Sequence, residues 1–409
     1  MPFNPLEQQG IPLDQQLRNW SELTVEPYDK RTIHPYSRSR VIVMNGIEVE
    51  SIIFSHQFNR MTDNLEIKTS LALARRVDQQ QQKAVNWLSP GNETPLETTI
   101  GYEQVAIDLT AWVAQNEPDP YVKQTFDFGL LEDFDHLYRY ANLYELIRGE
   151  RAENLTRDLT EIMPGRPTFV EHRHPADDLR RHFDRHTVDP LTRMHCMTVT
   201  AAEQQTMNFY MNHGPDFMEP IARGLYLEIA MIEEQHVTQY ESLIDPLESL
   251  LECLVFHKYN EVHMYHSFME DETEDRRLKQ LWELHLNMEI EQLKEACRLL
   301  QKYEGKTPEE ILPPQLPKGV KFQSNKDYVR QVLGQQVDLR TNGPDFVPVN
   351  TLPADHRSFA YQKMVNAGGN PSEWVVEENR EAQGREYRLQ PEGEHPVADL
   401  REPARTGNR

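Results

Sequence analysis

Cysteine is scarce in this chain, and its few copies are widely separated. Cys196, Cys253 and Cys297 are the only three among 409 residues, and no two of them form a Cys-x-x-Cys pair. A disulfide framework and a rubredoxin-type iron site are therefore not expected. Electrons for any redox chemistry would have to come from an external donor, either another protein or a small molecule.

Long apolar runs and positive charge are also in short supply. Hydrophobic residues make up 38% of the chain, and no run approaches the roughly 20 residues of a membrane span. The 43 Lys and Arg are outnumbered by 66 Asp and Glu, which gives a net charge of -23 and argues against nucleic-acid or anionic-membrane partners. The first residues, Met1 to Asn4, show no signal pattern, so a cytoplasmic location is expected.

Against this background, one constellation of acids and histidines occurs twice. The two sets have the same internal spacing and lie 100 positions apart: Glu103 with Asp133 and His136, and Glu203 with Glu233 and His236. An acid and a His three positions apart share a helix face. The 30 residues before each pair are enough to climb one helix, turn and return, and proline-containing breaks at 117–120 and 214–220 fall near the midpoints. The spacing predicts two helical hairpins whose ligands meet at mid-height.

The chemistry of these six side chains points to metal ions. Four carboxylates that face one another inside an apolar bundle would cost several kcal/mol each if they were left unpaired. Two divalent ions would neutralise them, and two neutral imidazoles would complete the ligand set. Mixed oxygen and nitrogen ligands suit iron or manganese, whereas structural zinc usually takes thiolates. We therefore expect two ions, iron in the first instance, with manganese also possible.

The repeated Glu and acid-x-x-His pattern resembles the ferritin-like di-iron carboxylate superfamily, which includes ferritins, rubrerythrins and di-iron oxygenases. The resemblance covers about residues 95 to 245 and does not identify the member. It implies an all-α fold, a four-helix bundle with a long crossover between its second and third helices. One departure is that the first pair has Asp133 where the family has Glu. Glu132, four positions before His136, is an alternative ligand, although the repeat spacing favours Asp133.

The rest of the chain divides by composition. The expected parts are an N-terminal arm (1–58), a helical domain (59–305) with a core bundle (95–245) and an extra helical pair (247–304), and an irregular C-terminal tail (306–409). Asn-Gly at 45–46 predicts a turn, either in a small hairpin over 41–53 or in an arm that lies on the bundle. The proline-rich, polar tail would be disordered or would wrap a neighbouring subunit, and a homodimer is expected.

Two tyrosines and two further residue sets have alternative interpretations. Tyr140 and Tyr240 each follow a candidate His ligand by four positions, so they could hydrogen-bond the ligands, carry a radical or simply pack. His182 and His186 could bind another metal or be ordinary exposed histidines. The third set is Glu261, Glu291 and Lys294, in which the acids are again 30 positions apart. It is either a degenerate copy with a side chain as its cation or a coincidence among many glutamates.

Two classes of function are compatible with this pattern. One is an oxidoreductase that activates O2 or peroxide at a carboxylate-bridged di-iron site, and the other is a ferroxidase or iron-storage protein without an organic substrate. About 90 residues precede the first bundle helix and some 165 follow the fourth, and such additions would obstruct a close-packed storage shell. They favour the enzyme. A structural bundle with a vestigial, metal-free site is the third alternative.

Overall fold

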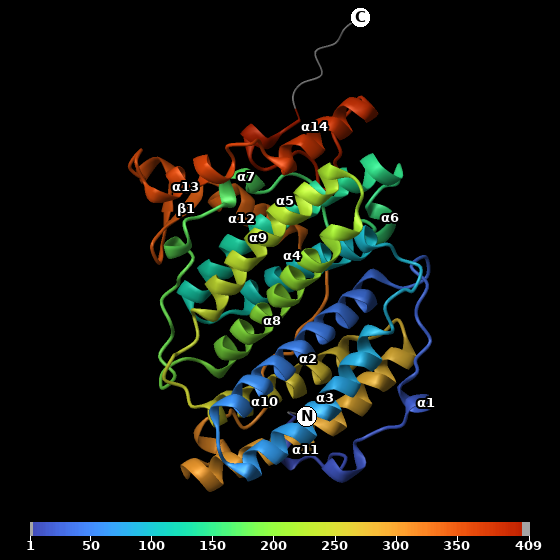
Figure 1. Cartoon of the computed structure of the whole chain (residues 1–409), viewed down its shortest axis with the longest axis vertical. Helices are drawn as coiled ribbons and strands as arrows, with labels where there is room; N and C mark the ends of the chain where they lie inside the picture. Colours follow the sequence, from blue (N-terminus) through green and yellow to red (C-terminus); the bar gives the residue numbers. More distant parts are fainter. Residues whose placement is uncertain (1–2, 403–409) are drawn as a thin grey trace, which may run out of the picture.

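The computed structural model describes residues 3–402, and its regular structure is almost entirely helical (Figure 1). The predicted all-α fold class is confirmed. Eight long helices dominate: α2 (Pro35–Met61), α3 (Leu65–Asn86), α4 (Pro95–Asn116), α5 (Pro120–Arg148), α8 (Pro190–His213), α9 (Pro220–Glu241), α10 (Leu250–Asp271) and α11 (Arg276–Glu304). None of the helices in residues 3–402 is both long and apolar enough to cross a membrane.

Shorter elements fill the connections and the C-terminal part. They are α1 (Trp20–Leu23), α6 (Glu153–Thr156), α7 (Thr168–Glu171), α12 (Lys326–Gln336), α13 (Arg357–Val365), α14 (Pro371–Gln383) and a hairpin of β1 (Leu339–Asn342) and β2 (Asp345–Pro348). The two strands are antiparallel, with Leu339 opposite Pro348.

Local sequence signals explain where the long helices begin and end. Proline occupies the first turn of α2, α4, α5, α8 and α9, where its missing N–H costs no helical hydrogen bond. Thr94 and Glu97 form a capping box at the start of α4. Gly149 and Gly305 end α5 and α11 with φ angles of 66° and 72°, which glycine adopts without strain.

The eight long helices form four antiparallel hairpins, and these pair into two four-helix units. Bundle A contains the hairpins α4–α5 and α8–α9, and bundle B contains α2–α3 and α10–α11. The middle hairpins of the sequence thus make one unit and the outer hairpins make the other. The two bundles pack together through α2, α4, α8 and α10, with bundle B in the lower half and bundle A in the upper half of Figure 1.

Helix α2 occupies the stretch for which the sequence predicted either a small hairpin over 41–53 or part of an arm on the bundle. It runs without interruption through Asn45 and Gly46. A Cβ atom on Gly46 would lie only 3.1 Å from the carbonyl oxygen of Ala201, so the glycine allows α2 to approach α8 closely. Asn45 accepts a hydrogen bond from Gln82 Nε2 at 2.7 Å. These tertiary contacts use the Asn-Gly pair for helix packing and override its preference for a turn.

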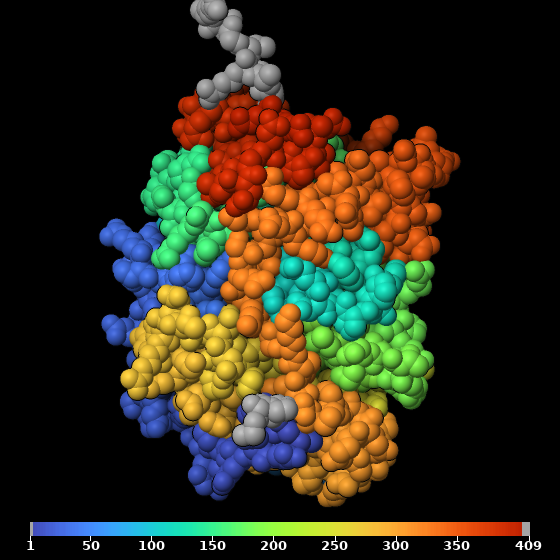
Figure 2. Space-filling view, turned by 180° about the vertical axis from the view of Figure 1, so that it is seen from behind, coloured from blue at the N-terminus to red at the C-terminus, as the bar shows by residue number. Residues whose placement is uncertain are grey.

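The C-terminal segment is also more ordered than its composition predicts. After α11 the chain crosses from bundle B to bundle A, seen as the orange segment on the rear face in Figure 2. Helices α12 and α14 then pack on bundle A, α12 against α5 and α14 against both α5 and α9. Glu373 pairs with Arg139 of α5 at 2.7 Å, and the Ser372 N–H donates to Glu228 of α9 at 2.7 Å. Contact with the bundle supplies the order that the segment's own sequence pattern does not indicate.

Helices α5 and α9 lie unusually close together at one glycine, and the effect of this contact on stability can be tested. A Cβ atom on Gly129 would overlap the hydroxyl oxygen of Tyr240. We expect Gly129→Ala to lower the free energy of unfolding by about 1–3 kcal/mol, because overpacking forces the helices apart. Urea denaturation measures this loss. The Tyr240 hydroxyl has no hydrogen-bond partner among the described residues, so adding Tyr240→Phe should recover most of it, and an unrecovered double variant would contradict the proposed clash.

Candidate metal centre

The six residues predicted as ligands come together in the middle of bundle A. Each of the four helices contributes: Glu103 from α4, Asp133 and His136 from α5, Glu203 from α8, and Glu233 and His236 from α9. All six side chains are buried. Their ligand atoms form two groups, in each of which the atoms lie within 4.8 Å of one another: Asp133, Glu203, Glu233 and His236 in one, and Glu103, His136 and Glu233 in the other.

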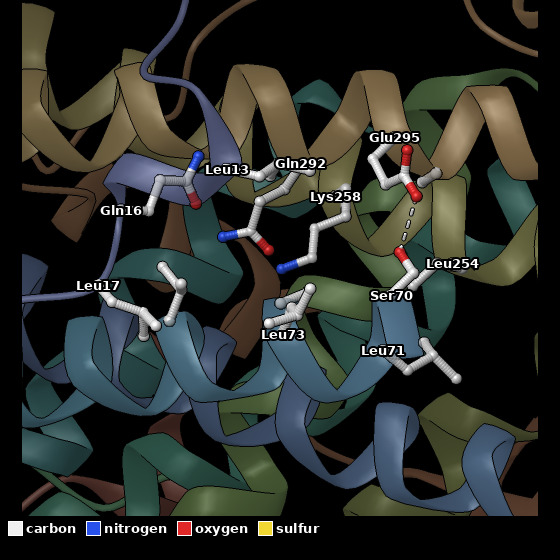
Figure 3. Close-up of a pocket in the computed structure, with 13 residues that line it drawn as sticks. Leu13, Gln16, Leu17, Ser70, Leu71, Leu73, Leu254, Lys258, Gln292 and Glu295 are labelled. Carbon is white, nitrogen blue, oxygen red and sulfur yellow. Dashed lines mark hydrogen bonds between the residues drawn. The ribbon is translucent and has the colours of Figure 1, made fainter. Parts of the chain in front are cut away.

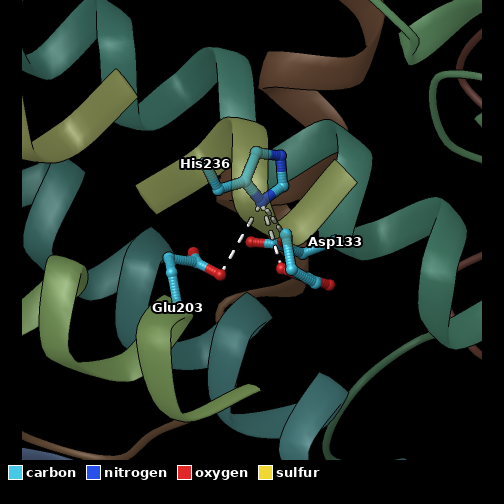
Figure 4. Close-up of side chains that lie close together, drawn as sticks. Asp133, Glu203 and His236 are labelled. Atoms are coloured by element: carbon cyan, nitrogen blue, oxygen red, sulfur yellow. Dashed lines mark ion pairs between the residues drawn. The ribbon is translucent and has the colours of Figure 1, made fainter. Parts of the chain in front are cut away.

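Glu233 connects the two groups because its two oxygens approach different histidines. Glu233 Oε1 is 3.1 Å from His136 Nδ1, and Glu233 Oε2 is 3.3 Å from His236 Nδ1. The same His236 nitrogen lies 3.3 Å from Asp133 Oδ1 and 3.6 Å from Glu203 Oε2 (Figure 4). The centroids of the two imidazole rings are 6.0 Å apart. A carboxylate between two imidazoles is placed as a bridging ligand would be.

Several oxygens in the centre lack the partners that buried carboxylates need. Within residues 3–402, no hydrogen-bond partner is found for either oxygen of Asp133 or for one oxygen each of Glu103, Glu203 and Glu233. Buried polar atoms are almost always satisfied, and an unpaired buried carboxylate is costly. Burial raises the pKa of Glu103 and of Glu203 well above the usual value. The unsatisfied oxygens and the two imidazoles together fit a pair of divalent ions.

Each candidate His ligand is held by a further carboxylate at its outer nitrogen. Glu171 Oε2 is 3.0 Å from His136 Nε2, and Glu132 Oε2 is 2.8 Å from His236 Nε2. When Nε2–H donates to a carboxylate, the Nδ1 lone pair is free to point into the centre, as in many histidine-ligated metal sites. Burial disfavours the charged imidazoles, but the surrounding carboxylates outweigh it and raise the pKa of both histidines.

Glu132 is in turn fixed by two buried arginines. Its Oε1 accepts from Arg166 at 2.9 Å and from Arg173 at 2.6 Å. Burial opposes ionisation of Glu132, yet Arg173, His236 and Arg166 together hold the pKa of this carboxyl well below its usual value. The geometry therefore separates the two alternative acids of α5. Asp133 points among the ligand atoms, whereas Glu132 lies on the far side of His236.

Three of these supporting residues were missed in the sequence. Arg166, Glu171 and Arg173 belong to the irregular crossover between α5 and α8, where no helical periodicity indicates which side chains turn inward. Only the run of charged and His residues from 171 to 174 distinguishes this stretch, and that run does not predict buried contacts. The crossover covers the centre as well as connecting the two hairpins.

The two tyrosines named from the sequence are buried beside the centre. The Tyr240 ring lies 6.1 Å from the His236 ring, and the Tyr140 ring packs 5.2 Å from the ring of Tyr210. Neither Tyr140 nor Tyr240 has a hydroxyl partner among the described residues. Tyr210, which the sequence pattern did not indicate, donates its hydroxyl to Glu103. The direct hydrogen bond from a tyrosine to a candidate ligand therefore comes from α8.

The other predicted sets do not form comparable groups. His182 contacts the carbonyl oxygen of Phe183, His186 is exposed, and neither belongs to a potential metal group found in residues 3–402. Glu291 pairs with Lys294 at 2.7 Å, and both side chains are partly exposed. Glu261 is buried elsewhere in bundle B.

Comparison with known proteins does not assign the chain to a family. No family model matches it, and neither a curated protein nor a solved structure is found to be similar. The resemblance to ferritin-like proteins therefore depends on the ligand pattern and its geometry.

Adjacent acids of α5 provide a matched test of the site. Asp133→Asn removes a charge from crowded carboxylates, so we expect it to lower metal content while leaving the metal-free protein at least as stable. Glu132→Gln leaves two buried arginines without their carboxylate, which should destabilise the protein by about 3 kcal/mol. Metal analysis and urea denaturation of both variants measure these effects. If Glu132→Gln alone emptied the site, Glu132 would be the ligand.

Proposed function

We propose that the protein holds two divalent ions, iron or manganese, in bundle A and uses them to activate O2 or peroxide. The observation that carries this proposal is the convergence of six buried ligands in two groups that share Glu233. Four carboxylates and two neutral imidazoles match the charge of two divalent ions. This mixture of hard and borderline ligands suits iron and manganese, and its placement on four helices is similar to that of the di-iron carboxylate proteins.

The residues around the centre have defined tasks in such a mechanism. When bound, a pair of such ions supplies two-electron redox chemistry toward O2 or peroxide. Glu171 and Glu132 orient the two imidazoles through their outer nitrogens, and the Tyr210 hydroxyl orients Glu103 by donating a hydrogen bond to it. The apolar packing of bundle A keeps bulk water away from the ligands. Electrons must come from an external donor, because the three cysteines are free and form no redox pair.

The surroundings of bundle A favour an enzyme over a storage subunit. Its outer helices α5 and α9 are covered by the C-terminal segment, and α4 and α8 are covered by bundle B. Among the four helices, mainly α8 and α9 keep an exposed face, which includes Met211, Leu227 and Met231, so only one hairpin is left for the side-by-side packing of a storage shell. A surface pocket is lined by Tyr210, Met211 and Arg223, and Tyr210 reaches from this pocket to Glu103. The Tyr210 side chain thus separates this pocket from Glu103, and a small oxidant would approach the centre past it.

Metal analysis tests the first half of the proposal. After anaerobic reconstitution with Fe²⁺, the native protein should retain two iron ions per chain. Glu233→Ala should lose most of this iron, because Glu233 belongs to both ligand groups. Glu234→Ala is the matched control, since Glu234 is exposed on the same helix and should have no effect. Less than half an equivalent of iron in the native protein, or equal losses in the two variants, would contradict the proposed centre.

Exposure of the reconstituted protein to air separates the two classes of function. For an oxidoreductase, air should change the optical absorption, and this change should reach its maximum when two iron ions per chain are bound. The particle size measured by light scattering should stay the same. A ferroxidase that stores iron should instead go on to accumulate many irons per particle. That second outcome would favour the iron-handling alternative, while retention of iron without any response to air would favour neither catalytic class.

A further inference from the structure

Bundle B contains a second buried acid cluster that is built on the plan of the candidate metal centre. Four acids with at most 1% exposure come from its four helices: Glu48 of α2, Asp78 of α3, Glu261 of α10 and Glu289 of α11. Asp78 follows Glu48 by 30 positions, the same spacing as in bundle A. In both bundles the first helix of each hairpin carries one acid, and the second carries an acid three positions before another polar residue.

The residues in the histidine positions differ between the two bundles. Gln81 follows Asp78 by three positions, and Gln292 follows Glu289 by three. Both glutamines are buried, with 2% and 3% exposure. Gln292 Nε2 donates to Glu289 at 2.9 Å, so its amide lies within the cluster. Bundle B therefore has the four carboxylates of the plan, with amides in place of imidazoles.

A lysine ammonium group occupies the centre of this cluster. Lys258 Nζ lies 2.7 Å from Glu261, 2.9 Å from Asp78 and 3.2 Å from Glu289. The side chain is only 3% exposed, and its charge also acts on Glu48. The sequence hypothesis of a degenerate copy with a side-chain cation had named Lys294 and Glu291. The structure instead has Lys258 of α10 as the cation and Glu289 of α11 as the acid. Glu291 lies two residues beyond Glu289, which turns its side chain by about 200° around the helix.

One ammonium group compensates this cluster only in part. Burial raises the pKa of Glu48 and of Glu289 well above the usual value, and it raises the pKa of Asp78 to about 6. Glu261 has a lowered pKa, since Lys258 outweighs the effect of its burial. The single ammonium group therefore leaves part of the charge of these acids uncompensated.

Unpartnered oxygens and a pocket give the cluster features of a ligand site. A pocket between the N-terminal segment, α3, α10 and α11 is lined mainly by apolar side chains, with Lys258, Gln292 and Gln16 among the polar ones (Figure 3). The side-chain carbonyl oxygens of Gln16 and Gln292 have no hydrogen-bond partner among the described residues. The side-chain oxygen and nitrogen of Gln81 also have none there. Carboxylate and amide oxygens are the ligands that hard divalent cations such as Mn²⁺, Mg²⁺ and Ca²⁺ prefer.

We propose that bundle B is a cation site which the native protein fills with the ammonium group of Lys258, and that a hard divalent cation takes its place once this group is removed. The proposal goes beyond the function of bundle A. It holds whether or not the six-residue centre there binds iron.

Manganese binding to Lys258→Ala tests this inference. The full-length variant should bind one more Mn²⁺ per chain than the native protein, measured by electron paramagnetic resonance of free Mn²⁺ during titration. The extra ion should disappear in Lys258→Ala/Glu261→Gln, which lacks one of the carboxylates. It should persist in Lys258→Ala/Glu233→Gln, in which the centre of bundle A is disabled. Lys294→Ala is the matched control, because this lysine belongs to the same bundle and is partly exposed.

Each other outcome contradicts the proposal. A folded Lys258→Ala variant without extra Mn²⁺ shows that the cluster is not a cation site, and an extra ion lost with Glu233→Gln places the binding in bundle A. If the variant is unfolded, circular dichroism with and without Mn²⁺ decides, because restored helicity supports the proposal. A variant that stays unfolded in Mn²⁺ shows that the ammonium group has a role that a divalent cation cannot replace.

Discussion

The compensation of buried negative charge is the constraint on which the rest of this structure depends. Each bundle buries a group of four acids between its helices, and bundle A also buries Glu132 beside them. Uncompensated carboxylates in such a place would cost several kcal/mol each. Bundle B meets this constraint in part with the ammonium group of Lys258. Bundle A has two imidazoles among its acids, and two buried arginines pair with Glu132. The carboxylate oxygens that remain without a hydrogen-bond partner are the strongest argument for bound metal ions.

The two bundles have a similar arrangement of helices and acids, but they compensate these acids with different side chains. Imidazole nitrogens in bundle A extend the ligand set toward transition metals, whereas the glutamines of bundle B leave only oxygen ligands. Lys258 ties together acids from α3, α10 and α11 without any external group. Bundle B therefore has the properties of a permanent support, against which α4 and α8 of bundle A are packed. The site for which we propose exchange of oxidants and electrons lies in the other bundle.

The segments outside the bundles contribute to the same centre. The crossover after α5 brings Glu171, Arg166 and Arg173 to the outer side of the histidines. Helix α14, which also contacts α7 of this crossover, holds α5 and α9 through Arg139 and Glu228. Precise ligand geometry requires that the ligand-bearing helices do not move relative to one another. The additions that distinguish this chain from a bare four-helix bundle thus have a mechanical reason to be present.

The sequence by itself determined the two hairpins of bundle A and the six residues that meet there. This was possible because helical spacing and hairpin length are local quantities, so Glu103 and Asp133, or Glu203 and Glu233, are placed by counting. The packing of α2 through Asn45 and Gly46, the buried arginines of the crossover, the order of the C-terminal segment and the choice of Glu289 over Glu291 were decided only by the tertiary structure. Each of them depends on contacts between segments far apart in the chain, and such contacts leave no periodic trace in the sequence.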